Sequence, residues 1–145
     1  MHQAIHKLID LSPIPNIYIR YKSRWMAPGS FAMHDFNPDM ETMDDSDWML
    51  WFHRMEMLSR LDLVSSNPLL IKQVNNLITI LKKGSGFFTR PLNHYFFKKW
   101  GAYSGLMLEK DWRSPKRRAY DLTFRSFLIL HYSGIMDLNE TTTSN

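Results

Sequence analysis

The sequence predicts an all-α fold of tandem αα-hairpins, preceded by an irregular N-terminal third. Apolar residues recur at intervals of three and four over long stretches, which is typical of amphipathic helices. A capping residue precedes proline at Asn67-Pro68 and at Ser114-Pro115, and this pair commonly starts a helix. Gly84 and Gly134 stand where these helices would end. The chain has 145 residues, enough for one domain, which we expect over residues 1–138.

The first 46 residues are predicted to be an irregular segment that covers the helices. A short helix is expected around Ala4–Leu11, and the two prolines within residues 12–15 then exclude a helix. Residues 17–21 alternate in polarity, which fits either a short strand or an extended segment laid across helices. Pro-Gly and Asn-Pro pairs follow, so we expect loops up to Asp47.

Residues 47–87 are predicted to form the first hairpin. Asp47, or Ser46 before it, is expected to cap the first helix. Its apolar stripe consists of Trp48, Trp51, Phe52, Met55 and Leu58. The second helix is expected to begin with Asn67 as N-cap and to end at Gly84, behind two lysines that suit the negative end of the helix dipole. Its apolar stripe consists of Leu70, Ile71, Val74, Leu77, Ile78 and Leu81.

Residues 88–134 are predicted to form a second hairpin. Its first helix is expected near Tyr95–Glu109, and the second begins at Ser114-Pro115. The stripe of that second helix consists of Tyr120, Phe124, Phe127, Leu128 and His131. The prolines at 68 and 115 are 47 residues apart, and helical repeat arrays have periods in the 40s. Residues 139–145 are expected to be a disordered tail.

This pattern resembles the α/α-toroid proteins, the terpenoid cyclases and protein prenyltransferases. The resemblance rests on residues 58–63, on Asn67-Pro68 and on residues 81–88, and it extends loosely over Trp48 to Gly134. The family has a Gln-x-x-x-Gly-x-Trp-like element after such a hairpin, and the equivalent positions hold Lys82, Gly86 and Phe88. A closed toroid needs about six hairpins, so the resemblance implies a terminal or shortened portion.

The acidic residues Asp44, Asp45 and Asp47 have two interpretations. Crowded carboxylates can bind a cation or supply a general acid, and the cyclases use Asp-x-Asp-Asp, whose spacing is reversed here. The simpler interpretation is a helix N-terminus, where anions favour the positive end of the dipole and one Asp caps. We expect the second.

The basic stretch 110–118 is a candidate anion site. Cations at the start of a helix oppose its dipole, and a bound phosphate or nucleic-acid backbone would repair this conflict. The residues concerned are Arg113, Lys116, Arg117 and Arg118. A solvated face, or pairing with the acidic residues 34–62 of the same chain, explains the stretch equally simply.

Aromatic residues near this stretch suggest a pocket for an apolar ligand or for nucleobases. The residues concerned are Trp100, Tyr103, Trp112 and Phe124. At helical spacing such residues are more often part of the core. The six histidines are scattered and predict no metal site.

Charge is unevenly distributed along the chain. Residues 34–62 carry eight acids against two arginines, a net −6, and residues 82–118 carry ten cations against two acids, a net +8. Such a division suits internal complementarity, self-association or an anionic partner. The chain has no cysteine, which excludes zinc–thiolate sites. No export signal and no run of about 18 apolar residues is present, so we expect a cytoplasmic protein without a membrane span.

Three functions are compatible with these features. The first is a non-enzymatic helical-repeat module that binds a protein partner or a second copy, since a short array has open ends. The second is a cyclase-like enzyme or a prenyl- or lipid-pocket protein. The third is a phosphate or nucleic-acid binder that uses residues 110–118. No nucleophile elbow, P-loop or GxGxxG motif occurs, which favours the first and predicts no cofactor.

Overall fold

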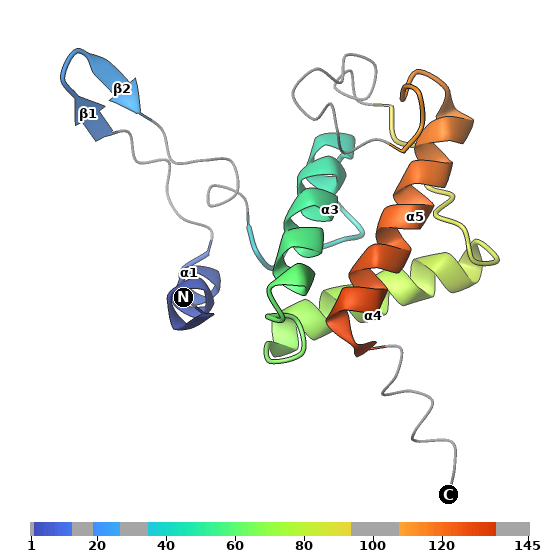
Figure 1. Ribbon diagram of the computed structural model, residues 1–145, viewed down its shortest axis with the longest axis horizontal. Helices are drawn as coiled ribbons and strands as arrows, with labels where there is room; N and C mark the ends of the chain where they lie inside the picture. The colour runs from blue at the N-terminus through green and yellow to red at the C-terminus, as the bar shows by residue number, and fades with distance from the viewer. Residues whose placement is uncertain (1, 13–18, 27–34, 94–107, 136–145) are drawn as a thin grey trace, which may run out of the picture. The chain divides into compact units, whose positions relative to one another are not determined.

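The computed structural model describes residues 2–12, 19–26, 35–93 and 108–135. The chain divides into two compact units, Met1–Met43 and Asp44–Asn145. Within the described ranges there are four helices and one two-stranded sheet, so the predicted helical class is confirmed (Figure 1). The toroid-like repeat of hairpins stays a prediction.

The first unit contains helix α1 (His2–Asp10) and an antiparallel hairpin of strands β1 (Ile19–Tyr21) and β2 (Arg24–Met26). Of the two alternatives for residues 17–21, the strand is present from Ile19 onward, and positions 17 and 18 lie outside the described residues. Strand β2 was not predicted. After α1, the hydroxyl of Ser12 accepts the backbone N–H of Phe36 at 2.6 Å, which links two segments of this unit.

In the second unit, helix α3 (Asp45–Arg60) begins with a capping box. The side chain of Asp44 accepts the N–H of Asp47 at 2.8 Å, and the side chain of Asp47 accepts the N–H of Asp44 at 3.2 Å. The predicted cap at Asp47 or Ser46 is therefore wrong, because Asp44 has the extended backbone of an N-cap and Asp47 closes the box from the third helical position.

Helix α4 (Pro68–Lys83) has the predicted boundaries. The Oδ1 atom of Asn67 accepts the N–H groups of Leu69 and Leu70 at 3.0 and 3.3 Å, which satisfies two donors that the first turn leaves free. Gly84 ends the helix, and a Cβ atom there would lie 2.1 Å from the carbonyl oxygen of Phe87. The tight turn after α4 therefore requires glycine.

The core of this unit is an aromatic cluster formed by α3 and the residue that follows the α4 turn. The ring of Phe88 lies edge-on to Trp48 and Phe52, with centroids 5.3 and 5.0 Å away. The indole N–H of Trp51 donates to Gln73 on α4 at 2.8 Å, so this polar atom is buried with a partner. The predicted stripe of α3 is buried, as are four members of the α4 stripe: Leu70, Val74, Leu77 and Leu81.

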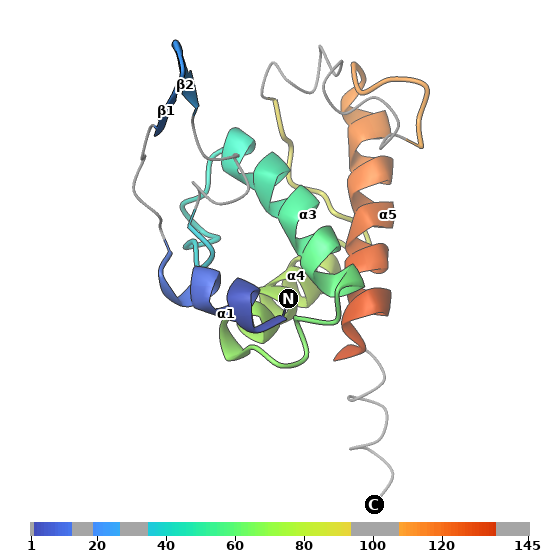
Figure 2. The same ribbon diagram turned by 60° about the vertical axis from the view of Figure 1, so that its left-hand side comes forward.

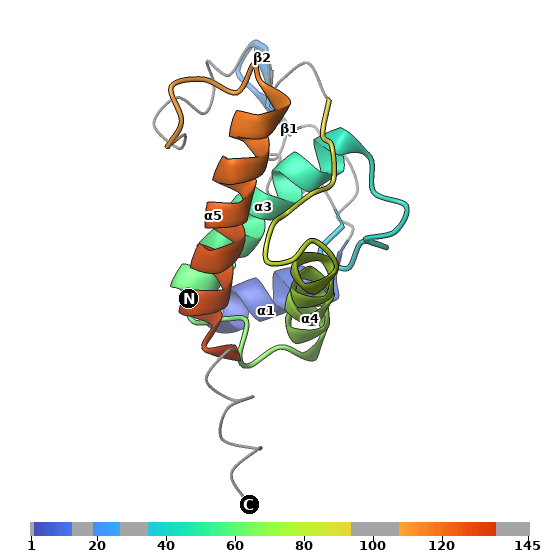
Figure 3. The same ribbon diagram turned by 90° about the vertical axis from the view of Figure 1, so that its right-hand side faces the viewer.

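Helix α5 (Pro115–Ser133) lies beside α3, and the two run in the same direction (Figures 1 and 2). Helix α4 crosses this pair at a steep angle and is seen nearly end-on in Figure 3. The most extensive packing of α3 is with α5, which is distant in sequence. Most of the predicted helix over residues 95–109 lies outside the described residues, so the second hairpin stays a prediction.

Candidate functional site

Helix α5 buries three of its charged residues. Arg118, Asp121 and Arg125 are almost completely inaccessible to solvent. Arg and Asp are rarely buried in this way unless they are paired, because an uncompensated charge in the interior is costly. The buried side of α5 therefore has to supply partners for these charges.

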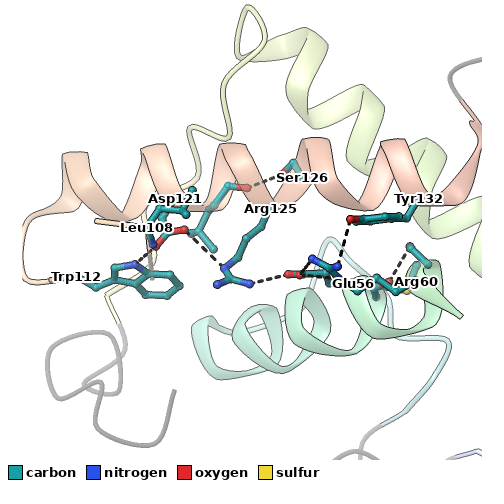
Figure 4. Close-up of polar contacts among 11 residues, drawn as sticks. Glu56, Arg60, Leu108, Trp112, Asp121, Arg125, Ser126 and Tyr132 are labelled. Carbon is teal, nitrogen blue, oxygen red and sulfur yellow. Dashed lines mark hydrogen bonds and ion pairs between the residues drawn. The ribbon is translucent and has the colours of Figure 1, made fainter. Parts of the chain in front are cut away.

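A chain of polar contacts, which we call the polar seam, provides partners for Asp121 and Arg125 along the α3–α5 contact (Figure 4). The Oδ2 atom of Asp121 accepts the indole N–H of Trp112 and, at 3.1 Å, the backbone N–H of Leu108. Its Oδ1 atom lies 3.7 Å from the Nε atom of Arg125. Arg125 in turn donates to Glu56 on α3 at 2.6 Å.

The polar seam continues toward solvent at the end of α3. Glu56 also accepts from Arg60 at 2.9 Å, and this hydrogen bond raises the pKa of Arg60. Arg60 donates to the hydroxyl of Tyr132 at 3.2 Å and lies over its ring at 4.5 Å. Each carboxylate of the seam is thus paired with arginine, an arrangement that fixes the helices rather than supplying a free acid or base.

His53 on α3 interacts electrostatically with Glu56 and Arg125 of the polar seam. Burial lowers its pKa, the charge of Glu56 opposes this shift, and the charge of Arg125 adds to it. The imidazole is therefore held toward its neutral form beside a network of fixed charges.

The side of α5 that faces away from the buried charges exposes aromatic residues to solvent. Tyr120, Phe124 and Phe127 are each more than two-fifths exposed. At 3.6 residues per turn they share one face with an exposed residue on either side. This outward stripe consists of Lys116, Tyr120, Phe124, Phe127 and His131. The Nζ atom of Lys116 lies 5.6 Å from the centroid of the Tyr120 ring, so a cation covers one end of the stripe.

The four predicted anion-binding residues do not share one environment. Arg118 is buried, and it donates to the carbonyl oxygens of Trp112 and Arg113 at 2.8 and 3.1 Å. Burial lowers its pKa. Arg117 forms an ion pair with Asp111 at 2.7 Å. Of the four, Arg113 before α5 and Lys116 in its first turn are exposed.

The side chains of the acidic cluster accept hydrogen bonds from backbone N–H groups. Asp44 and Asp47 form the capping box of α3, and the side chain of Asp45 accepts the N–H of Asn93. These contacts favour the helix-capping interpretation over a general acid. Within the described ranges, no group of three or more His, Cys, Asp or Glu residues could hold a metal ion.

The predicted aromatic pocket is only partly within the described residues. Trp100 and Tyr103 lie outside them. Trp112 is buried against Asp121, whereas Phe124 is exposed on the outward stripe. The structure therefore does not place these two residues in one buried lining.

No family model, curated protein or solved structure matches this chain. No helix in the described ranges is long and apolar enough to cross a membrane.

The polar seam was not predicted from the sequence, and the face of α5 that was expected to be buried is wrong. Tyr120, Phe124 and Phe127 were expected in the core, and they are exposed. A second stripe of small and aliphatic residues at the same spacing was the available signal for the true buried face. It consists of Leu122, Ser126, Ile129 and Ser133.

Proposed function

We propose that this chain is a non-enzymatic helical interaction module, and that the outward stripe of α5 binds a second copy of the chain. The observation that supports this is the exposure of three aromatic side chains on one helix face, opposite a face that buries charges. Clustered exposed aromatics are enriched at protein interfaces. Helix faces of this kind pair with other helices through residues three and four apart.

The order of residues in the stripe favours a second copy as the occupant. Phe124 is its centre, with Tyr120 four residues before and Phe127 three residues after. If two α5 helices cross antiparallel at Phe124, the Tyr120 of each copy meets the Phe127 of the other. Such a self-complementary patch is what a two-fold dimer requires.

Charge sets the direction of the pairing. The stripe carries a lysine at its start and no acidic residue. A parallel crossing would bring the two Lys116 side chains together, whereas an antiparallel crossing at Phe124 separates them by about 24 Å along the axis. That separation exceeds the screening length of about 8 Å in physiological salt, so repulsion between them is small.

The size of the stripe predicts a weak dimer. One helix face buries less than the roughly 1,600 Å² of a standard protein interface. We therefore expect reversible dimerisation with a dissociation constant in the micromolar range. Because the contact is aromatic, added salt should not dissociate it.

Sedimentation velocity over a concentration series tests this proposal. We expect the wild-type chain to shift from monomer to dimer and Phe124→Ser to remain a monomer. Met57→Ser is the matched control, since Met57 lies on α3 and is 40% exposed against 42% for Phe124. This control should dimerise like the wild type.

One result would overturn the proposal, and the stability of Phe124→Ser would then identify what covers the stripe. A wild-type chain that is monomeric at all concentrations excludes the second copy. If Phe124→Ser then also lowers the free energy of unfolding by about 3 kcal/mol, as loss of a buried aromatic would, the chain's own residues cover the stripe. If Phe124→Ser lowers the free energy of unfolding by only about 0.5 kcal/mol, as substitutions at surface positions do, a different protein would be the partner of the outward stripe.

A further inference from the structure

The β1–β2 hairpin of the first unit presents a second exposed surface, independent of α5. All side chains from Arg20 to Trp25 are exposed. The two aromatic side chains are highly exposed to solvent: the exposed fraction is 61% for Tyr21 and 68% for Trp25. Water-exposed Trp at this level is unusual for a side chain that is mostly apolar, which indicates a surface that contacts a ligand.

Charge on the hairpin has one sign. Arg20, Lys22 and Arg24 contribute +3, and no acidic residue occurs in the sequence between Asp10 and Asp35. The Nζ atom of Lys22 lies 5.5 Å from the centroid of the Tyr21 ring. The hairpin is therefore a local concentration of positive charge among aromatic rings, which favours an anionic ligand.

The strand register places one ring and one guanidinium on each face. Arg20 pairs with Trp25 across the hairpin, and Tyr21 pairs with Arg24. Cross-strand partners project to the same face, and successive residues project to opposite faces. Each face thus combines a flat stacking surface with a donor that binds phosphate oxygens in a bidentate manner.

We infer that the β1–β2 hairpin binds single-stranded nucleic acid. A base stacks on the exposed ring of Trp25 or Tyr21, and the neighbouring arginine contacts the adjacent phosphate. Aromatic stacking combined with cationic backbone contacts is the general mode by which proteins hold single strands without reading their sequence. In a duplex the bases are already stacked on one another, so their faces cannot reach these rings.

The arrangement fits a membrane surface less well. An interfacial segment directs its apolar side chains to one side and its charges to the other. Here the two rings lie on opposite faces, and the turn between the strands carries Lys22 and Ser23. No single orientation of the hairpin would bring both rings into a bilayer interface.

Fluorescence anisotropy of a labelled oligothymidylate of about 12 nucleotides, titrated with the full chain, tests the inference. Three cations predict that the logarithm of the affinity falls with the logarithm of salt concentration with a slope of about −2 for a single strand. Trp25→Ala should raise the dissociation constant about tenfold through lost stacking, and it should leave the salt slope unchanged. Arg20→Gln should reduce the slope by about 0.7.

Matched variants separate this mode from simple charge attraction. Trp25→Phe should retain most of the affinity because it keeps a ring. Lys72→Gln combined with Lys83→Gln removes two exposed cations outside the hairpin and should have little effect, whereas Arg20→Gln combined with Arg24→Gln should abolish measurable binding.

Several outcomes would overturn the inference. If Trp25→Ala binds the oligothymidylate as tightly as wild type, the hairpin attracts it by charge alone and no base stacks on Trp25. Equal losses in the two double variants would mean that charge anywhere on the chain suffices. Tighter binding to the matching duplex would exclude stacking on free bases. Co-sedimentation with phosphatidylserine vesicles, together with no change in oligothymidylate anisotropy, would assign the hairpin to a lipid surface.

Discussion

Arg125 links helices α3 and α5 through an ion pair with Glu56. It contacts Glu56 on α3 and Asp121 on its own helix, and both carboxylates are largely or fully shielded from solvent. Buried ion pairs contribute little net stability compared with apolar replacements, but the loss of one partner leaves a bare charge in the interior. The polar seam is thus more important as a constraint on how the helices pair than as a source of stability.

We expect Arg125→Gln to lower the free energy of unfolding by about 3–5 kcal/mol, because Glu56 and Asp121 would lose their common partner. Arg117→Gln is the control, since the Arg117–Asp111 pair is partly exposed and such pairs contribute less than about 1 kcal/mol. Urea unfolding followed by circular dichroism measures both. Equal losses in the two variants would contradict a buried role for Arg125.

His53 predicts a pH dependence of stability. Burial lowers its pKa in the folded state, so the unfolded chain binds a proton more readily as the pH falls below the usual histidine value of about 6.5. The contribution of His53 to the free energy of unfolding should therefore be constant above the usual histidine value. It should decrease as the pH falls through the pKa that His53 has in the folded state.

The difference between wild type and His53→Gln isolates this contribution. Urea unfolding between about pH 7.5 and about pH 5 should show a smaller loss of stability for the variant, because glutamine does not titrate in this window. Parallel curves for the two proteins would show that the shift at His53 does not affect folding.

At the scale of elements, local signals predicted α3 and α4 well. Asn67-Pro68 and Gly84 set the ends of α4, and the tryptophan-rich stripe of α3 is buried. These features depend on residues three or four apart, which the sequence displays directly. The polar seam could not be predicted in this way, because Glu56 and Arg125 are 69 residues apart and neither has a local sign of burial.

Helix α5 shows why hydrophobicity alone selected the wrong face. Two stripes follow the helical period, one aromatic and one of small and aliphatic residues. The aromatic stripe has more apolar area, so periodicity favours it. The structure buries the other stripe, because that face also carries Asp121 and Arg125, and Arg125 reaches its partner Glu56 only at the contact with α3.

The caps of the helices predict unequal effects of substitution. Asp44→Ala removes the half of the α3 capping box in which the Asp44 side chain accepts the N–H of Asp47, and it should lower the free energy of unfolding by about 1 kcal/mol. Ser114 occupies the same position in α5, but its side chain makes no capping hydrogen bond. Ser114→Ala should therefore cost much less. Urea unfolding of both variants checks this order, and a larger loss for Ser114→Ala would contradict it.

At the scale of the whole molecule, each compact unit carries one of the two surfaces proposed above. The hairpin surface is in the unit Met1–Met43, and the outward stripe is in the unit Asp44–Asn145. The first combines rings with three cations, whereas the second has one lysine and one histidine at its ends. Their chemistry differs, so one surface is expected to bind an anionic polymer and the other a helix.

The two surfaces should respond separately to substitution. Phe124→Ser should abolish self-association and leave oligothymidylate affinity within about twofold of wild type when measured on monomeric chains, because substitutions that share no partners act additively and the two surfaces belong to separate compact units. Trp25→Ala should weaken the affinity for the oligonucleotide and leave dimerisation unchanged. Sedimentation velocity and anisotropy on both variants measure this. A large cross-effect in either direction would mean that the two surfaces are coupled.

The opposite faces of α5 also bear on how the chain folds. During collapse, the aromatic face offers the larger immediate gain, since each ring can bury about 150–250 Å². The charged face becomes favourable only after Glu56 is in place to receive Arg125. Early compact states should therefore hold α5 rotated by roughly half a turn, with Phe124 inside. We then expect the helix to roll into its native packing, which would make α5 a locally frustrated element in which one buried face has to be exchanged for the other.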